Sequence, residues 1–367
     1  MITPDHIRAI APYQPGKPIS ELAREMGLDE RDIVKLASNE NPLGVSPKAR
    51  AAIAGCLDEL ALYPDGNGFE LKSAIARKYD VGLDQIVLGN GSNDVLELAA
   101  RALLTPASSA VYAQHAFAVY PLVTQAIGAT GIEAKAKNYG HDLGAMLAAI
   151  RPDTRIVFIA NPNNPTGTLL GAEELHGFLG KVSPEVLVVL DEAYVEFLPE
   201  DKLTPSVAWL QEFPNLLVSR TFSKAYGLAG LRVGYGVAQP EWTGLLNRVR
   251  MPFNVSGPAQ AAACAAIADD DFLQRSYDLN RTGLAALGAG LREMGLEFVP
   301  SHANFLLVRV GPKAAQVYRA LLAAGVIVRP VANYDLPDCL RVSVGLPQEN
   351  ARFLAALRTA LAALAAT

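Results

Sequence analysis

The region from residue 68 to residue 240 alternates short apolar runs with stretches of helical periodicity. Several of the runs are apolar on both faces, as strands must be when helices cover both sides of a sheet. The alternation predicts an α/β fold, with a mostly parallel central sheet flanked by helices. The expected strands are Gln85–Leu88, Ala110–Tyr112, Arg155–Ala160, Val186–Leu190, Leu216–Ser219 and Val233–Val237.

The pattern changes on both sides of this region. The first 38 residues are proline-rich with little periodicity, which favours an arm that packs on another part of the chain. Beyond residue 250, a long helical region from about Pro258 to Met294 leads to strands near Asn304–Val310, Val326–Val328 and Cys339–Val344. A chain of 367 residues is long for one core. We therefore expect a large domain at 39–250 and a small α+β domain at 251–367 that also includes the arm at 1–38.

Composition excludes several classes of protein. Half of the residues are hydrophobic and 19% are charged, which permits a sizeable core and argues against disorder. The net charge of −5 does not favour binding to nucleic acid or to an anionic membrane, both of which attract basic proteins. The start of the sequence lacks a signal-peptide pattern, and no apolar run approaches the roughly 18 residues of a membrane span. The three cysteines, Cys56, Cys264 and Cys339, are far apart in the sequence and odd in number. They match neither a set of disulfides nor the spacing of a metal site, so we expect a protein of the reducing cytoplasm without a metal site.

Four polar segments each follow an expected strand. Ligands of an open parallel sheet bind at the carboxyl ends of its strands, so a single site at this edge can collect all four segments. The segments are Gly89–Asp94, Asn161–Gly167, Asp191–Tyr194 and Ser219–Lys224.

The first two segments each have a chemical and a structural interpretation. Gly89–Asp94 opens a helix with free N–H groups and the Ser92 hydroxyl, which suits a phosphate. Helix capping by Asp94 explains the same residues, and the missing third glycine argues against a dinucleotide fingerprint. Asn161–Gly167 is a rigid turn with two prolines, in which Asn164 offers an amide or is simply part of the turn.

The other two segments carry ionisable groups. Asp191 ends an apolar run, and a buried carboxylate needs a partner, either an arginine or a protonated ring nitrogen of a cofactor. Tyr194 adds a phenol. Lys224 lies among small and apolar residues, which would lower the pKa of an amine nucleophile, and Arg232 would either reinforce this effect or bind an anion. A surface loop is the alternative for Lys224. Together the four segments provide the groups that pyridoxal 5′-phosphate (PLP) requires.

The sequence resembles the fold-type I PLP-dependent aminotransferases and, within them, the histidinol-phosphate aminotransferase family. The resemblance runs along nearly the whole chain and is specific in both the set and the order of its motifs. The motifs are IAPYQPG at 10–16, KLASNENPLG at 35–44, LYPDG at 62–66, GNGSND at 89–94, HAFAVY at 115–120, NPNNPTG at 161–167, DEAYVEF at 191–197, RTFSKAYGLAGLRVGY at 220–235 and LRVSVG at 340–345.

The resemblance implies roles in holding PLP. Lys224 is implied to bind the cofactor covalently and then to move a proton at the substrate carbon. Asp191 is implied to pair with the ring nitrogen, and Asn164 and Tyr194 to hold the ring oxygen. Phe117 would stack on the ring, where relatives often have tyrosine. The residues implied to surround the phosphate are Ser92, Asn93, Thr221, Ser223 and Arg232.

The resemblance also implies substrate contacts and a homodimer. Tyr63 is implied to reach the cofactor phosphate of the neighbouring subunit. Arg341 would take the α-carboxylate of glutamate. Arg329 and Tyr13 would meet the phosphate of histidinol phosphate or the distal carboxylate of glutamate, although a structural ion pair also explains Arg329. Asn41 matches a position where the family's arm lines the pocket.

The implied reaction transfers an amino group from histidinol phosphate to 2-oxoglutarate, giving imidazole acetol phosphate and glutamate in histidine biosynthesis. An aromatic amino acid aminotransferase or a threonine-phosphate decarboxylase of the same fold remains open. A PLP-domain transcription regulator would need an added DNA-binding segment and a basic patch. A dehydrogenase lacks its third glycine, and the hydrolase motifs G-x-S-x-G and H-E-x-x-H are absent from the sequence.

Overall fold

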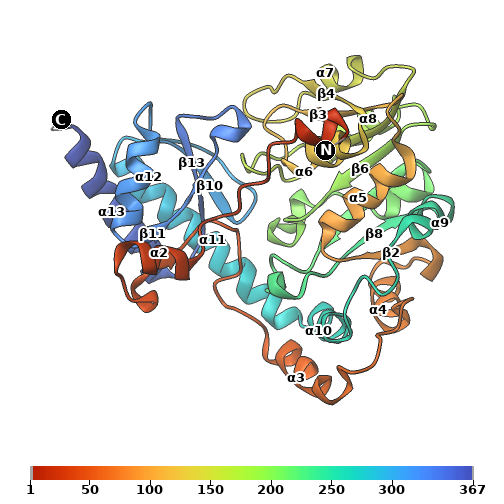
Figure 1. Cartoon of the computed structure of the whole chain (residues 1–367), viewed down its shortest axis with the longest axis horizontal. Coiled ribbons are helices and arrows are strands. Elements are labelled where there is room, and N and C mark those ends of the chain that lie inside the picture. Colours follow the sequence, from red (N-terminus) through yellow and green to blue (C-terminus); the bar gives the residue numbers. More distant parts are fainter. Residues whose placement is uncertain (1–2, 366–367) are drawn as a thin grey trace.

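The computed structural model describes residues 3–365 and centres on a seven-stranded sheet (Figure 1). Neighbouring strands are parallel except at β8, which is antiparallel to both β2 and β7. The mostly parallel sheet expected from the sequence is confirmed. In spatial order the strands are β2 (Ile86–Gly89), β8 (Gly234–Ala238), β7 (Leu216–Thr221), β6 (Leu187–Asp191), β5 (Thr154–Ala160), β3 (Ser109–Ala113) and β4 (Thr130–Ala134).

The edge strand β4 was absent from the expected set. Its first four residues are exposed or only partly buried, so the strand has no continuous apolar run to reveal it. β6 and β7, by contrast, are buried along their whole length. A periodicity argument therefore finds the central strands and misses an edge strand whose side chains face solvent.

The reversed direction of β8 has a consequence for the site. The amino end of β8 lies at the edge where the parallel strands have their carboxyl ends. Gly234, at the start of β8, pairs with Thr221 on one side and Gly89 on the other. Arg232, just before the strand, is therefore delivered to the same edge as the four polar segments.

Helices pack against the sheet (Figure 1). α5 (Ser92–Leu103) contacts β2, β7 and β8 and packs beside α6 (Val119–Ile127) and α9 (Pro240–Val249). α7 (Leu143–Ala148) packs on α8 (Ala172–Leu179). α4 (Phe69–Tyr79) contacts β2 and, with α3 (Pro47–Gly55), packs on α10 (Gly257–Ile267). These elements share one large hydrophobic core.

A second core forms around a four-stranded antiparallel sheet. Its strands in spatial order are β12 (Arg329–Pro330), β13 (Cys339–Ser343), β10 (Phe305–Arg309) and β9 (Glu297–Val299). The helices that pack with it are α11 (Asp270–Glu293), α12 (Ala314–Ala323) and α13 (Pro347–Ala365). The single helical region expected from Pro258 is two helices, α10 and α11. The break falls at Ala268–Asp269, where the buried Asp269 carboxylate pairs with Lys48 at 3.1 Å.

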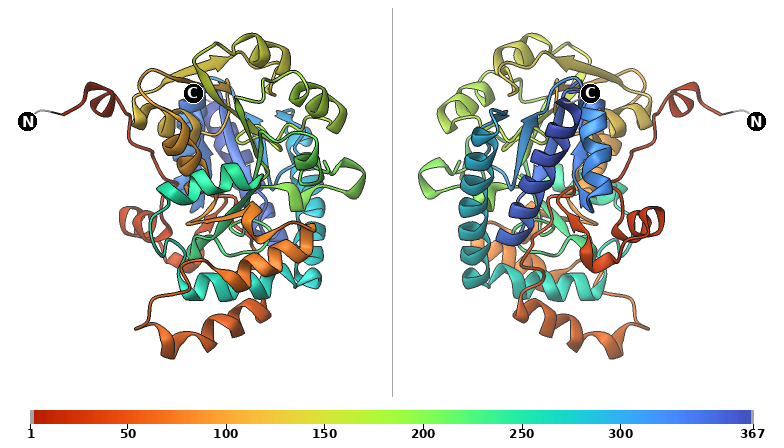
Figure 2. Two further views of the ribbon diagram at one scale, coloured as in Figure 1. Left: turned by 90° about the vertical axis from the view of Figure 1, so that its right-hand side faces the viewer. Right: turned by 90° about the vertical axis from the view of Figure 1, so that its left-hand side faces the viewer.

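The amino-terminal segment has more regular structure than the sequence predicts. α1 (Asp5–Arg8) lies at the outer edge of the molecule and contacts α6 (Figure 2). α2 (Ile19–Met26) buries Leu22 against Leu322 of α12 and Ile327, in a small cluster separate from the second core. β1 (Val34–Lys35) pairs in parallel with β11 (Val326–Ile327). The arm thus packs on both parts of the chain, α1 on the large domain and α2 with β1 on the small one.

The domain boundaries at residues 38 and 250 stay predictions, and residues 1–2 and 366–367 of those ranges lie outside the described residues. None of the helices within residues 3–365 is long and apolar enough to cross a lipid bilayer. The short 3-10 helices are η1 (Glu30–Asp32), η2 (Leu57–Glu59), η3 (Leu83–Gln85), η4 (Val195–Phe197), η5 (Glu200–Lys202), η6 (Ala208–Gln211), η7 (Ala229–Leu231) and η8 (Ala332–Tyr334).

Candidate active site

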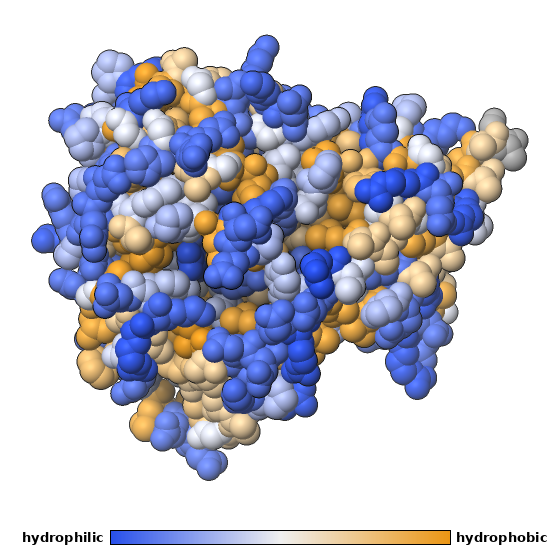
Figure 3. Space-filling model, turned by 180° about the vertical axis from the view of Figure 1, so that it is seen from behind, coloured by the Kyte–Doolittle hydropathy of each residue, from blue (hydrophilic) through white to orange (hydrophobic). Residues whose placement is uncertain are grey.

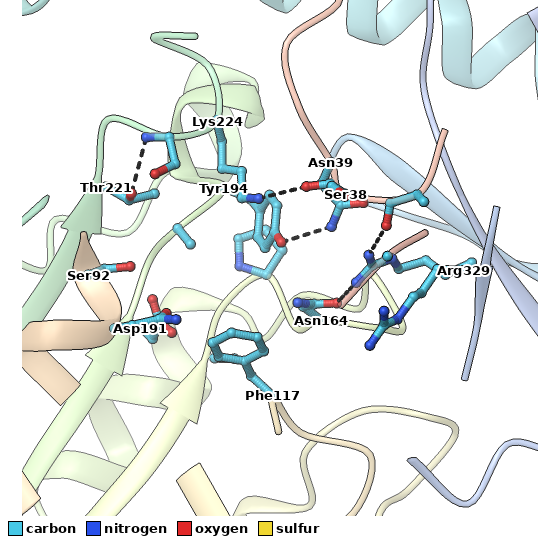
Figure 4. Close-up of a pocket in the computed structure, with 18 of the residues that line it drawn as sticks. Ser38, Asn39, Ser92, Phe117, Asn164, Asp191, Tyr194, Thr221, Lys224 and Arg329 are labelled. Atoms are coloured by element: carbon cyan, nitrogen blue, oxygen red, sulfur yellow. Dashed lines mark hydrogen bonds between the residues drawn. The ribbon is translucent and has the colours of Figure 1, made fainter. Parts of the chain in front are cut away.

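A pocket at the carboxyl edge of the large sheet brings all four polar segments together and is closed from the other side by the small sheet and the arm (Figure 4). The predicted convergence of the four segments is thus seen in the structure. Of the residues singled out in the sequence, those that line the pocket are Tyr13, Ser92, Asn93, Phe117, Asn164, Asp191, Tyr194, Thr221, Ser223, Lys224, Arg232, Arg329 and Arg341. Their individual roles remain predictions.

Lys224 follows β7 and points into the pocket. Its Nζ donates a hydrogen bond to the carbonyl oxygen of Ser38 at 3.0 Å. Burial and, after it, the positive charge of Arg341 lower the pKa of the amine to about 7. The negative charge of Glu40 opposes this shift, and Arg232 contributes a smaller lowering. The desolvation expected from the apolar neighbours is therefore the main cause, while the stronger of the two cations is Arg341. The amine is partly neutral near pH 7, as a nucleophile or base must be.

Asp191 is the last residue of β6 and is 5% exposed. Its Oδ2 accepts a hydrogen bond from the Tyr120 hydroxyl at 2.9 Å, whereas its buried Oδ1 has no hydrogen-bond partner among the described residues. Burial raises the pKa of this carboxyl to about 6, against the opposing effect of the Tyr120 hydrogen bond. An unpaired buried carboxylate oxygen calls for a cationic donor from a ligand.

Tyr120 was missed in the sequence analysis, although it ends the HAFAVY motif. It lies on α6, fully buried, and stacks on Phe158 with ring centroids 4.9 Å apart. Phe117 packs edge-on against it at 5.9 Å and lines the pocket. The start of α6 therefore supplies the hydroxyl that bonds to Asp191, and the loop just before it supplies an aromatic wall of the pocket.

Two glycines allow Arg232 and β8 to pack closely against the amino end of α5. Gly91 has a φ of 78°, a conformation that disfavours other residues, and a Cβ there would overlap the guanidinium of Arg232. A Cβ on Gly234 would likewise overlap the backbone nitrogen of Ser92. Arg232 donates to the Ser223 hydroxyl at 3.2 Å. A helix amino terminus beside a guanidinium and hydroxyl groups is suited to a phosphate.

The opposite end of the pocket carries two arginines. Arg329 and Arg341 lie directly opposite each other on β12 and β13, and both are buried. Like charges at such positions destabilise a sheet unless anions compensate them. Neither arginine forms an ion pair within residues 3–365. The guanidinium of Arg329 lies over the ring of Tyr13 at 5.4 Å. The structural ion pair considered for Arg329 is therefore not seen.

Hydrogen bonds orient the two groups predicted to hold a ring oxygen. Asn164 accepts a bond from Arg341 through Oδ1, which leaves its Nδ2 as a donor toward the pocket. Tyr194 accepts a bond from Asn39 at 3.0 Å, and its own hydroxyl proton has no protein acceptor among the described residues (Figure 4). Two donors thus face one region of the pocket.

Two predicted residues lie elsewhere. Asn41 does not line the pocket, because its amide nitrogen is turned away to donate to Ala225 and to Ser276 of α11, each at 2.8 Å. Asn39, two residues earlier, lines the pocket instead. Tyr63 is 83% exposed and stacks on Phe253 at 4.7 Å, outside the pocket. The role of Tyr63 therefore depends on a second subunit and stays a prediction.

A buried ion pair behind the pocket ties two of its segments together. Arg220 on β7 donates to Oε2 of Glu192 at 2.9 and 2.8 Å, and Ser206 donates to the same oxygen. The backbone nitrogen of Glu192 donates to Ser219 at 2.8 Å. Since Glu192 follows Asp191 and Arg220 precedes Lys224, the pair fixes the spacing of the two ionisable groups. Neither residue was identified from the sequence.

Comparison with known proteins identifies the class. The model of the aminotransferase class I and II family matches residues 31–357, so the chain belongs to this family. Relatives that it resembles include histidinol-phosphate aminotransferase 2 of Nitrosospira multiformis, 61% identical over 98% of this chain and 92% of that protein. The histidinol-phosphate aminotransferase of Methylobacillus flagellatus is 63% identical, over 98% and 97% of the two chains.

A solved structure shares the whole fold. The crystal structure of histidinol-phosphate aminotransferase from Sinorhizobium meliloti in complex with pyridoxal-5′-phosphate superposes with a TM-score of 0.90 at 29% identity, over 98% of this chain and 97% of that one. The residues of the present pocket fit the same cofactor. The unpaired Oδ1 of Asp191 suits a protonated ring nitrogen, and Lys224 is a desolvated amine. The amino end of α5, beside Ser223 and Arg232, suits a phosphate.

The position of Asp191 predicts a pH-dependent cost in stability. Its pKa is raised from 3.8 to about 6 in the folded protein, so the carboxyl ionises more readily in the unfolded chain and the fold loses stability as pH rises from about 4 to about 6. In the cofactor-free protein we expect Asp191→Asn to increase the free energy of unfolding by up to about 3 kcal/mol above about pH 6, with little gain below about pH 4. Urea unfolding at both pH values measures the difference, and an equal effect at both would contradict the assignment.

The lowered pKa of Lys224 predicts its chemical reactivity. In the cofactor-free protein, we expect labelling of Lys224 by a small amine-reactive reagent to rise with pH and to level off above about pH 8, because a pKa of about 7 makes the amine neutral by then. Mass spectrometry of a digest quantifies the label, and exposed lysines in the same digest serve as internal controls. Labelling that keeps rising to about pH 10 would show an ordinary amine.

Proposed function

We propose that this protein is a histidinol-phosphate aminotransferase that transfers an amino group from histidinol phosphate to 2-oxoglutarate. The observation that carries the proposal is one pocket with Lys224 and Asp191 at one end and two buried, unpaired arginines at the other. The names of relatives about 60% identical over nearly the whole chain support it. Transamination of this kind belongs to histidine biosynthesis.

The pocket residues have defined tasks under this proposal. When bound, PLP supplies an electron sink for chemistry at the carbon next to the substrate nitrogen. Asp191 holds the proton of the ring nitrogen through Oδ1. Lys224, near half-neutral at pH 7, takes a proton from the substrate carbon and returns it. Asn164 and Tyr194 donate hydrogen bonds to the ring oxygen, and Arg232 with Ser223 holds the phosphate.

The two arginines explain how one pocket accepts two substrates. Both the carboxylate of an amino acid and a phosphate monoester present oxygen pairs that a guanidinium binds through two hydrogen bonds. Arg341, close to Lys224 and Asn164, binds the α-carboxylate of glutamate. Arg329, beside Tyr13, binds the distal group, which is a phosphate in one substrate and a carboxylate in the other.

We also propose that the enzyme is a cytoplasmic homodimer. A groove between α4, α10 and the segment that follows α3 is lined by residues that include exposed apolar side chains, and such patches mark interfaces between proteins (Figure 3). The exposed apolar residues in and beside the groove are Leu57, Leu60, Leu62, Tyr63, Phe69, Met251 and Phe253. A partner seated there would carry Tyr63 toward a neighbouring site. The unpaired cysteines are consistent with a reducing compartment.

Substrate assays test the proposed reaction. We expect turnover of histidinol phosphate with 2-oxoglutarate, and a loss of about 100-fold in kcat/KM for histidinol phosphate in Arg329→Ala, because a charged hydrogen-bond partner of the phosphate is removed. Phenylalanine, which has no distal anion, should show a much smaller change. Arg329→Lys is the matched control that keeps the charge.

Threonine phosphate and phenylalanine distinguish the other activities of the same fold. Turnover of either one without any turnover of histidinol phosphate would refute the proposal.

Mixing subunits tests the dimer. If each site combines Lys224 of one subunit with Tyr63 of the other, a dimer of one Tyr63→Phe subunit and one Lys224→Ala subunit has one intact site. We expect such mixed dimers, assayed at limiting PLP, to recover activity that neither variant shows alone. The upper limit is about half of the activity of a wild-type dimer, because one of the two sites is intact. Size-exclusion chromatography verifies the assembly. A monomer, or a mixture no more active than the sum of its parts, would refute the shared site.

A further inference from the structure

Asn39 occupies an unusual backbone position beside the pocket. Its φ of 55° lies in the left-handed region, which asparagine tolerates better than most residues other than glycine. The residue is 1% exposed, and its carbonyl oxygen accepts a hydrogen bond from Asn304 at 3.0 Å. A buried residue held in a sparsely populated conformation is a marker of function, since the surrounding structure must offset the strain.

The hydrogen bonds of Asn39 fix which way its amide points. The backbone nitrogen of Asn39 donates to Oγ of Ser343 at 2.9 Å, so the single proton of that hydroxyl is free to go elsewhere. It goes to Oδ1 of Asn39 at 2.8 Å. Only the amide oxygen can accept it, so Nδ2 must face Tyr194, to which it donates at 3.0 Å.

This orientation decides what Tyr194 does with its proton. A phenol oxygen that accepts a bond from Asn39 cannot direct its own hydrogen back at the same donor. No protein acceptor for that hydrogen exists among residues 3–365, and the phenol lines the pocket (Figure 4). We propose that Asn39 is a positioning residue that keeps Tyr194 as a hydrogen-bond donor to the ring oxygen of PLP, an inference that rests on the proposed function.

Burial and the neighbouring charges determine the pKa of the Tyr194 phenol. Burial raises the pKa of the phenol to about 12, so it keeps its proton throughout the working range. The positive charge of Arg341 opposes the rise, as does the bond from Asn39, while Asp191 and Tyr334 add to it. Nζ of Lys224 lies 5.9 Å from the centre of the ring. The bond from Asn39 polarises the phenol and strengthens its donation to an acceptor in the pocket.

The absorption of the holoenzyme without substrate reports this donation. A hydrogen bond to the ring oxygen favours its ionised form and lowers the pH midpoint of the cofactor's absorption change. Asn39→Gly retains the left-handed conformation and removes the amide, so we expect the midpoint to rise by about half a unit. Asn39→Asp places an acceptor against the phenol and turns its proton away, so we expect a rise of about one unit or more.

Two further variants separate positioning from a structural role. In the Tyr194→Phe background, Asn39→Gly should cause no further shift, because the effect passes through the phenol. Asn304→Ala loosens the same backbone segment without touching the amide, so it should lower the unfolding temperature and leave the midpoint unchanged. An unchanged midpoint in Asn39→Gly, or an equal shift in the Tyr194→Phe background, would overturn the inference.

The same measurements keep this inference apart from the proposed function. They use bound cofactor and no substrate. Shifted midpoints without turnover of histidinol phosphate would support the role of Asn39 and refute the proposed reaction. Turnover of histidinol phosphate with unshifted midpoints would support the proposed reaction and refute the role of Asn39. If Asn39→Asp does not fold, Asn39→Gly decides the result alone, since glycine adopts the required backbone conformation without strain.

Discussion

Burial of charge at the carboxyl edge of the central sheet is the constraint on which the site depends. It acts on two groups in opposite directions, lowering the pKa of Lys224 to about 7 and raising that of Asp191 to about 6. Both shifts favour the neutral form of the group. A ligand with a protonated ring nitrogen would reverse the second shift, because an opposite charge favours the carboxylate. Ionising Asp191 without a cofactor therefore costs free energy, and a cofactor with a protonated ring nitrogen removes that cost.

The sheet topology determines which charges meet. β8 is antiparallel to its neighbours, so its first residues lie at the same edge of the sheet as the end of β7. Arg232, just before β8, is therefore close to Lys224, just after β7. The buried pair of Arg220 and Glu192 then holds the segments after β6 and β7 in register. A buried ion pair of this kind is costly to break on one side, so the spacing it sets is rigid. Rigid spacing is what a catalytic pair requires.

Much of this arrangement could be predicted from the sequence, since local signals sufficed. Apolar runs located the central strands, and the topology of parallel sheets placed four polar segments at one edge. What the sequence did not reveal depends on contacts between distant positions. Tyr120 meets Asp191 across 71 residues, and Arg341 rather than Arg232 is the stronger cation at Lys224. Asn41 was assigned to the pocket through the family resemblance, whereas Asn39 lines it, held by contacts with Ser343 and Asn304 that lie 304 and 265 residues away.

Under the proposed function, the paired arginines account both for the substrates that the pocket accepts and for those that it rejects. Arg329 and Arg341 are neighbours across two strands and are buried with no carboxylate partner among residues 3–365, so each costs free energy until an anion binds. A fixed guanidinium recognises charge and a pair of oxygens, features that carboxylate and phosphate share, and this permits two different distal groups in one site. A substrate without a distal anion leaves Arg329 desolvated and unpaired. The proposed function therefore predicts that such a substrate is rejected through the cost of that unpaired group, which exceeds what apolar contact alone discriminates.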